Sequence, residues 1–108
     1  MKQHLKPEQI RAGNLCYDEF GKPFIIKPRN INFTWGITPI PIEDKYLITL
    51  GFKETENSEH RWETEDGVCY ENKRIGIHND LFTEVYFVHE IQNYYFGVMK
   101  KDLEIKQD

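Results

Sequence analysis

The histidines, cysteines and carboxylates of this 108-residue chain are the residues that could do chemistry, and their spacing decides which chemistry is open to them. His89 and Glu90 begin like the zinc-protease pattern HExxH, in which two histidines one helical turn apart bind the metal. Asn93 stands at the position that requires the second histidine. The sequence therefore argues against this class of metalloenzyme.

A second candidate set of metal ligands consists of His60, Cys69 and His78, which follow one another at intervals of nine residues on neighbouring predicted strands. Three such ligands could hold a metal ion, but the spacing matches no compact zinc pattern. We therefore expect no metal site and no cofactor.

Acidic residues are numerous between Glu54 and Glu71, and a pair of them could in principle serve acid–base catalysis. General-acid catalysis needs a carboxyl group in an apolar environment. The carboxyl groups between Glu54 and Glu71 fall in polar loop and hairpin segments, which do not provide one. Glycine-rich phosphate loops, GxSxG and dinucleotide fingerprints are also missing from the sequence. We predict that the protein is not an enzyme.

The two cysteines, Cys16 and Cys69, lie 53 residues apart in apolar, strand-like contexts. This arrangement favours two reduced, buried thiols over a disulfide or a catalytic nucleophile. Residues 1–7 are basic but no apolar stretch follows them, so they do not form a secretory signal. The sequence has no run of about 18 apolar residues. We expect a cytoplasmic protein.

Charge is unevenly distributed along the chain, whose net charge is −4. Residues 1–34 carry a net +3 and residues 35–72 a net −6. The acidic middle argues against general nucleic-acid binding, which depends on neutralising phosphates. A local basic patch is still open as an alternative, with Tyr17, Phe20 or Trp35 as stacking faces. Its members would be Lys6, Arg11, Lys22, Lys27 and Arg29.

Alternating apolar residues and turn signals predict two hairpins and further short strands. Asp66-Gly67 favours a type I′ turn between the strands of the second hairpin. A short helix is expected from Glu43 to Leu50, with Gly51 as its C-cap and Phe52 folded back on its last turn. The predicted strands cover residues 14–18, 23–27, 61–65, 68–71 and 74–78, with 83–86 and 103–105 as possible further strands.

From Phe87 to about Lys101 the hydrophobic period changes to that of a helix. The residues expected to face the core form one arc: Phe87, Val88, Ile91, Tyr94, Tyr95, Val98 and Met99. Phe96 is the one large apolar residue on the other side, where it lies in a polar stripe. The stripe could be a small binding surface or could pack against a second layer. It consists of His89, Gln92, Asn93, Phe96 and Lys100.

Three segments resemble, in order, the motifs of a family of short proteins from gut bacteria and their phages or mobile elements. Residues 10–16 (IRAGNLC) resemble LRxGNxV, residues 39–52 resemble PIPLTEExLLKLGF, and residues 88–96 (VHEIQNYYF) resemble VHQLQNLYF. Glu43 departs from the family threonine that would cap the middle helix. The resemblance spans residues 8–106; it implies an α+β fold and a mobile-element context, and it transfers no functional site.

Together these features predict a single α+β domain over residues 1–108, with residues 1–7 as a flexible leader and 107–108 as a flexible tail. An antiparallel sheet of about five short strands is expected to pack on a C-terminal helix, with an N-terminal hairpin that curls as in an SH3-like barrel. We expect a non-enzymatic binding or adaptor protein that acts on a protein partner through the polar stripe. The alternative is a nucleic-acid-associated protein that uses the basic patch.

Overall fold

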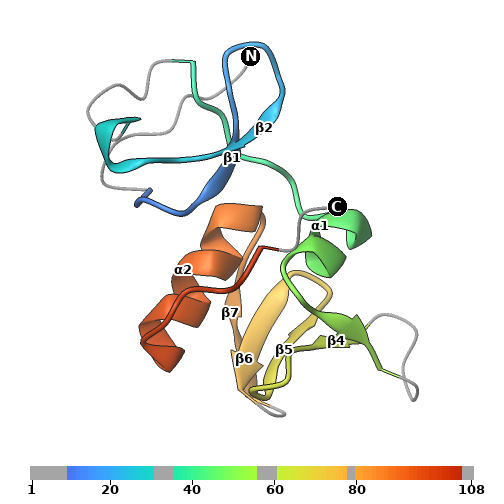
Figure 1. The fold of residues 1–108 in the computed structure, drawn as a ribbon. Helices are drawn as coiled ribbons and strands as arrows, with labels where there is room; N and C mark the ends of the chain where they lie inside the picture. The colour runs from blue at the N-terminus through green and yellow to red at the C-terminus, as the bar shows by residue number, and fades with distance from the viewer. Residues whose placement is uncertain (1–9, 31–35, 56–60, 78–79, 106–108) are drawn as a thin grey trace.

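The fold is α+β, as the sequence predicts, with a five-stranded antiparallel sheet, a separate two-stranded hairpin and two α-helices (Figure 1). The structure, a computed structural model, describes residues 10–30, 36–55, 61–77 and 80–105. The strands are β1 (Leu15–Tyr17), β2 (Pro23–Ile25), β3 (Lys53–Glu54), β4 (Arg61–Glu63), β5 (Val68–Glu71), β6 (Arg74–Ile77) and β7 (Asp80–Glu84). The helices are α1 (Asp44–Thr49), α2 (Val88–Met99) and a 3₁₀ turn, η2 (Pro28–Asn30).

The five-stranded sheet is a meander in which every strand pairs with its neighbour in the chain, in the order β3-β4-β5-β6-β7. Trp62 lies opposite Tyr70, and Tyr70 lies opposite Ile75, so three large side chains form one row across the sheet. All three are buried in the main core. This row is the face of the sheet that packs towards the helices.

The hairpin between β4 and β5 forms as expected, but its turn is not the expected type I′ turn. Gly67 has a φ angle of 87°, whereas Asp66 keeps a negative φ. Thr64 and Val68 instead close a longer loop through a 2.9 Å backbone hydrogen bond. The two consecutive positive φ angles of a type I′ turn occur at Asn72 (46°) and Lys73 (64°), between β5 and β6.

Both helices have clear local stop signals. Gly51, at a φ of 90°, follows the end of α1, and the Phe52 N–H then donates to the Leu47 carbonyl at 2.9 Å. The fold-back predicted for Phe52 is therefore confirmed, and its side chain is buried in the main core. Helix α2 ends at Lys100, whose φ of 59° is left-handed, slightly before the predicted end.

At the start of α2, a carboxylate closes the first turn. Glu90 accepts hydrogen bonds from the N–H groups of Tyr86 at 2.9 Å and Phe87 at 3.0 Å. These are donors that the helix cannot satisfy internally, and a negative charge suits this end of the helix.

The N-terminal hairpin of β1 and β2 divides its side chains between two cores. Leu15 and Ile25 face the main core, which also holds the buried residues of both helices. Cys16 and Phe24, one residue along each strand, face a second cluster with Ile10, Ile26 and Ile37. The hairpin is thus a two-stranded layer of its own rather than part of an SH3-like barrel.

The C-terminal segment after α2 differs from the expected edge strand. Residues 103–105 form no strand, but Leu103 and Ile105 pack against the main core. Within the described residues, neither helix has the length and apolar character that crossing a membrane requires.

Candidate binding site

The polar stripe of α2 lies largely inside the molecule. His89 and Gln92 are 5 % and 3 % exposed, so the stripe is not the open surface that the binding hypothesis needs. The other alternative from the sequence, that the stripe packs against a second layer, applies to this part of α2. That layer is the β1–β2 hairpin, which lies against the helix (Figure 1).

Gln92 and Asn93 join α2 to the hairpin through hydrogen bonds. The Gln92 side chain accepts from the Leu15 N–H at 2.7 Å and donates to the Gly13 carbonyl at 3.0 Å. Asn93 accepts from the buried amide of Asn14 at 2.8 Å. These two members of the stripe therefore hold the fold together.

Phe96, at 39 % exposure, is covered on one side by the guanidinium group of Arg11, which lies 4.1 Å from the ring centre. Arg11 also forms a 2.5 Å ion pair with Asp102 and donates to the Gln92 carbonyl at 3.3 Å. Lys100 is exposed and forms the left-handed C-cap of the helix. Within the stripe, Phe96 and Lys100 are exposed, and Phe96 is already in contact with Arg11. Asn93 is half-buried and, with His89, lines a shallow hollow beside the end of β7.

His89 is a buried imidazole stacked on Phe87, with ring centres 6.0 Å apart. Its Nδ1 atom has no hydrogen-bond partner among the described residues. Burial lowers the pKa of His89, and the nearby carboxylate of Glu90 opposes that shift. His89 is therefore neutral near pH 7, and its site resembles a packed core position more than a surface for a partner.

The basic residues of the predicted nucleic-acid patch are divided among different places. Lys6 lies outside the described residues, as does the proposed stacking residue Trp35. Arg11 is engaged with Phe96 and Asp102 on α2 and the segment after it. Lys22 is exposed near the tip of the hairpin, close to Phe20, which is 78 % exposed. The five basic residues therefore do not form one patch in the described part of the chain.

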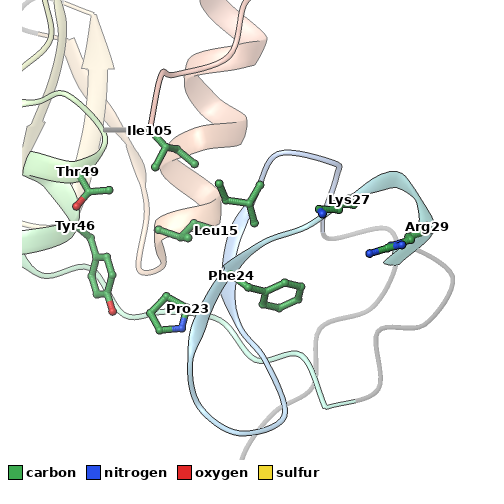
Figure 2. Close-up of a pocket in the computed structure, with 9 residues that line it drawn as sticks. Leu15, Pro23, Phe24, Lys27, Arg29, Tyr46, Thr49 and Ile105 are labelled. Carbon is green, nitrogen blue, oxygen red and sulfur yellow. The ribbon is translucent and has the colours of Figure 1, made fainter. Parts of the chain in front are cut away.

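Lys27 and Arg29, the two remaining basic residues, line a hollow between the hairpin and α1. The hollow has a volume of about 650 Å³, within the range of sites that hold small ligands. Figure 2 shows Lys27 and Arg29 on one side of it, and Tyr46, Thr49 and Ile105 on the other. The rest of the lining is Leu15, Pro23, Phe24 and Ile25.

The chemistry of this hollow is an apolar lining with positive charge at one side. None of the described residues that line it is acidic, although the chain as a whole carries a charge of −4. Both basic side chains are exposed at the rim. The hollow therefore suits a ligand that is partly apolar and carries a negative charge.

Tyr46 supplies a hydroxyl group at the α1 side of the hollow. Its oxygen lies 3.5 Å from that of Tyr17, and burial, with a further contribution from Tyr17, raises the pKa of Tyr46 to about 12. The phenol stays protonated at neutral pH and can donate a hydrogen bond. Thr49 donates its own hydroxyl to the Lys45 carbonyl at 2.9 Å, so it contributes mainly its methyl group.

The cysteines are both unpaired and buried, as predicted. Burial raises the pKa of the Cys69 thiol, which lies 3.4 Å from a nitrogen of Arg61 and 3.5 Å from a carboxylate oxygen of Glu63. The other two members of the suggested metal set, His60 and His78, lie outside the described residues. No group of three potential metal ligands occurs within the described residues.

A second, polar hollow of about 460 Å³ lies where the β4–β5 turn meets the end of α2. There the Tyr95 hydroxyl donates to Asp66, and the Lys101 ammonium lies 3.5 Å from the same carboxylate. The bond from Tyr95 is the main cause that lowers the pKa of Asp66, and burial raises that of Tyr95 to about 12. These groups satisfy one another, so we assign them a structural role.

Comparison of the chain with protein-family models, curated proteins and solved structures finds no match. The candidate site therefore stands on its geometry alone. Sequence reasoning named Lys27 and Arg29 but not the apolar residues around them, because the hollow is created by the docking of the hairpin beside α1. No pattern within either segment signals that arrangement.

Proposed function

We propose that this protein is a non-enzymatic binding module that takes an acidic, partly apolar segment of a protein partner into the hollow between β2 and α1. The observation that carries the proposal is the charge of the hollow, which has two basic and no acidic side chains among its described lining in a chain of net charge −4. Charge complementarity of this kind selects partners and speeds association.

The polar groups at the hollow support binding rather than catalysis. Tyr46, with a pKa of about 12, is a hydrogen-bond donor and a poor base at neutral pH. The Thr49 hydroxyl is engaged with the helix backbone. A cytoplasmic location is part of the proposal and is supported by two unpaired, buried thiols. The mobile-element context implied by the sequence resemblance would place the partner among proteins encoded by the same element.

The test is selection of a random peptide library on the immobilised full chain. We expect peptides that combine acidic and apolar residues, and we expect their affinity to fall at least about tenfold on Arg29→Glu. Lys22→Glu is the matched control, because it changes the net charge equally at an exposed site outside the hollow. It should leave the affinity of the selected peptides nearly unchanged.

Two results would overturn this function. One is that no peptide is selected, or that selected peptides bind Arg29→Glu as well as the wild type. The other is that a fluorescent single-stranded oligonucleotide binds at low salt and that Lys22→Glu and Arg29→Glu weaken it equally. The second result would support the nucleic-acid alternative, with the exposed Phe20 as a stacking face.

A further inference from the structure

Strand β2 has one edge that faces away from its partner. The backbone bonds from Ile26 to Asn14 (2.8 Å) and from Asp18 to Lys22 (2.8 Å) fix which residue pairs of the hairpin exchange hydrogen bonds. Leu15 and Ile25 lie opposite each other between these bonded pairs. In an antiparallel ladder, residues at such a position direct their N–H and C=O groups outward.

Contacts of β1 confirm this assignment. The outward N–H of Leu15 donates to Gln92, and the outward groups of Tyr17 pair with Thr38 at 2.9 and 3.1 Å. The outer side of β1 is therefore occupied. On β2, the corresponding outward groups of Ile25 have no backbone partner among the described residues.

The hollow follows this outer edge of β2. Its lining includes Ile25, whose side chain faces the main core, and Phe24, whose side chain faces the second cluster. Because neighbouring residues of a strand point to opposite faces, a space that touches both Phe24 and Ile25 passes along the edge of β2. Figure 2 shows Pro23 and Phe24 on β2, with Tyr46 and Ile105 across from the strand.

We propose that the partner segment binds as an extended strand added to the outer edge of β2. This inference rests on the proposed function and specifies its mode of recognition. The Ile25 N–H and C=O bond the segment's backbone, as in other cases of strand addition. An apolar side chain of the segment packs on Leu15, Ile25 and Ile105, and an acidic one pairs with Arg29.

The occupant follows from the site itself. Backbone pairing requires an extended peptide, and Pro23, which has no N–H group, limits pairing towards that end of the strand. The positive charge of Arg29 at the rim requires an acidic residue near the other end. A flat aromatic ligand would use the apolar lining but would leave the outward Ile25 groups without partners.

The experiment is a backbone N-methylation scan of an acidic peptide selected on the wild-type chain. Methylation of every second residue should weaken binding at least about tenfold, because those N–H groups face β2, while the residues between should tolerate it. Ile25→Pro provides the complementary test on the protein, since it removes the outward N–H and spares the hydrogen bonds to β1. Its thermal unfolding is measured alongside to confirm that it folds.

The outcomes separate the two proposals. Peptide binding could depend on Arg29 while N-methylation either leaves the affinity unchanged or lowers it without alternating along the peptide. In that case strand addition is wrong and the binding function stands. If no Arg29-dependent peptide exists, both proposals fail. Both the binding function and strand addition are supported by an affinity loss that alternates along the methylated peptide, is kept in Lys22→Glu and disappears in Arg29→Glu.

Discussion

At the scale of single residues, Gln92 does for β1 what a neighbouring strand would do. The outward N–H of Leu15 and the C=O of Gly13 both bond the Gln92 amide, at 2.7 and 3.0 Å. A side-chain amide carries a donor and an acceptor side by side, as a peptide group does. This explains why a polar side chain that is 3 % exposed lies beside the main core.

Replacing Gln92 by leucine should destabilise the fold by about 2–6 kcal/mol, because the buried Leu15 N–H and the half-buried Gly13 carbonyl each lose a partner at a cost of about 1–3 kcal/mol. Urea unfolding at neutral pH measures the change. Gln92→Glu is the matched variant, since it retains an acceptor for the Leu15 N–H and lacks the donor for Gly13. A Gln92→Leu protein as stable as the wild type would show that water or a local shift satisfies both groups.

His89 makes the stability of the fold depend on pH. Burial lowers its pKa below the ordinary value of 6.5, so the folded state binds a proton less readily than the unfolded state. The contribution of this pKa difference to the free energy of unfolding is fully present above about pH 6.5. It is lost as the pH falls through the lower pKa of the folded state. We expect the urea midpoint to drop between pH 7.5 and pH 5.

His89→Gln removes this titration while keeping a neutral polar side chain. The wild type should lose more stability than the variant over the same pH interval, and the difference isolates His89 from the other titrating groups. Equal losses in the two proteins would mean that His89 contributes nothing to the acid sensitivity.

At the scale of elements, the sequence identifies the hairpins better than their turns. Asp66-Gly67 is the favoured pair for a type I′ turn, yet the left-handed pair is Asn72 and Lys73. The reason is register, since Glu71 pairs with Arg74 and leaves two residues to reverse the chain. Register depends on how β5 and β6 place Tyr70 and Ile75 in the core, which the local sequence does not specify.

This turn predicts a stabilising substitution. Lys73 has a φ of 64°, a conformation that costs a side-chain-bearing residue about 1 kcal/mol and costs glycine little. Lys73→Gly should raise the stability by about 0.5–1 kcal/mol, measured by calorimetry. Lys73→Ala removes the same contact with the Tyr86 ring but keeps the strain. A glycine variant no more stable than the alanine variant would contradict this explanation.

Helix α2 shows why the face of a helix is harder to predict than its existence. The sequence predicts its span closely, and Val88, Ile91 and Tyr95 are buried as expected. Val98, placed on the same arc, is 38 % exposed, while His89 and Gln92 are inside. A hydrophobic arc assumes a single covering layer, whereas this helix contacts the main core on one side and a polar hairpin interface on the other.

At the scale of the whole molecule, three segments that are far apart in the sequence, residues 10–16, 39–52 and 88–96, contact one another. Asn14 from the first bonds Asn93 from the third at 2.8 Å. The Ile40 carbonyl, in the second, accepts from Val88 at 2.8 Å. The polar residues of these segments are therefore explained by assembly of the fold. The candidate binding hollow depends on the same assembly, so it could not be found from any one segment.

The same assembly predicts how the molecule unfolds. Cys16 belongs to the second cluster and Cys69 to the five-stranded sheet, so their thiols report on two different parts of the fold. Leu15 and Ile25 extend from the hairpin into the main core. Because one strand pair contributes to both cores, we expect them to open together.

Burial raises the pKa of Cys16 from 9.0 to about 12, so its thiolate fraction at pH 8 is about a thousandfold lower in the folded protein. An aromatic disulfide reagent should therefore label neither thiol in the native state. Labelling measured at increasing urea, and assigned to each cysteine by mass spectrometry, should give one midpoint that coincides with the loss of helix. If Cys16 reacted at lower urea than Cys69, the hairpin would open alone. The hollow would then be present only while the hairpin stays closed on α1, and peptide binding would slow the labelling of Cys16.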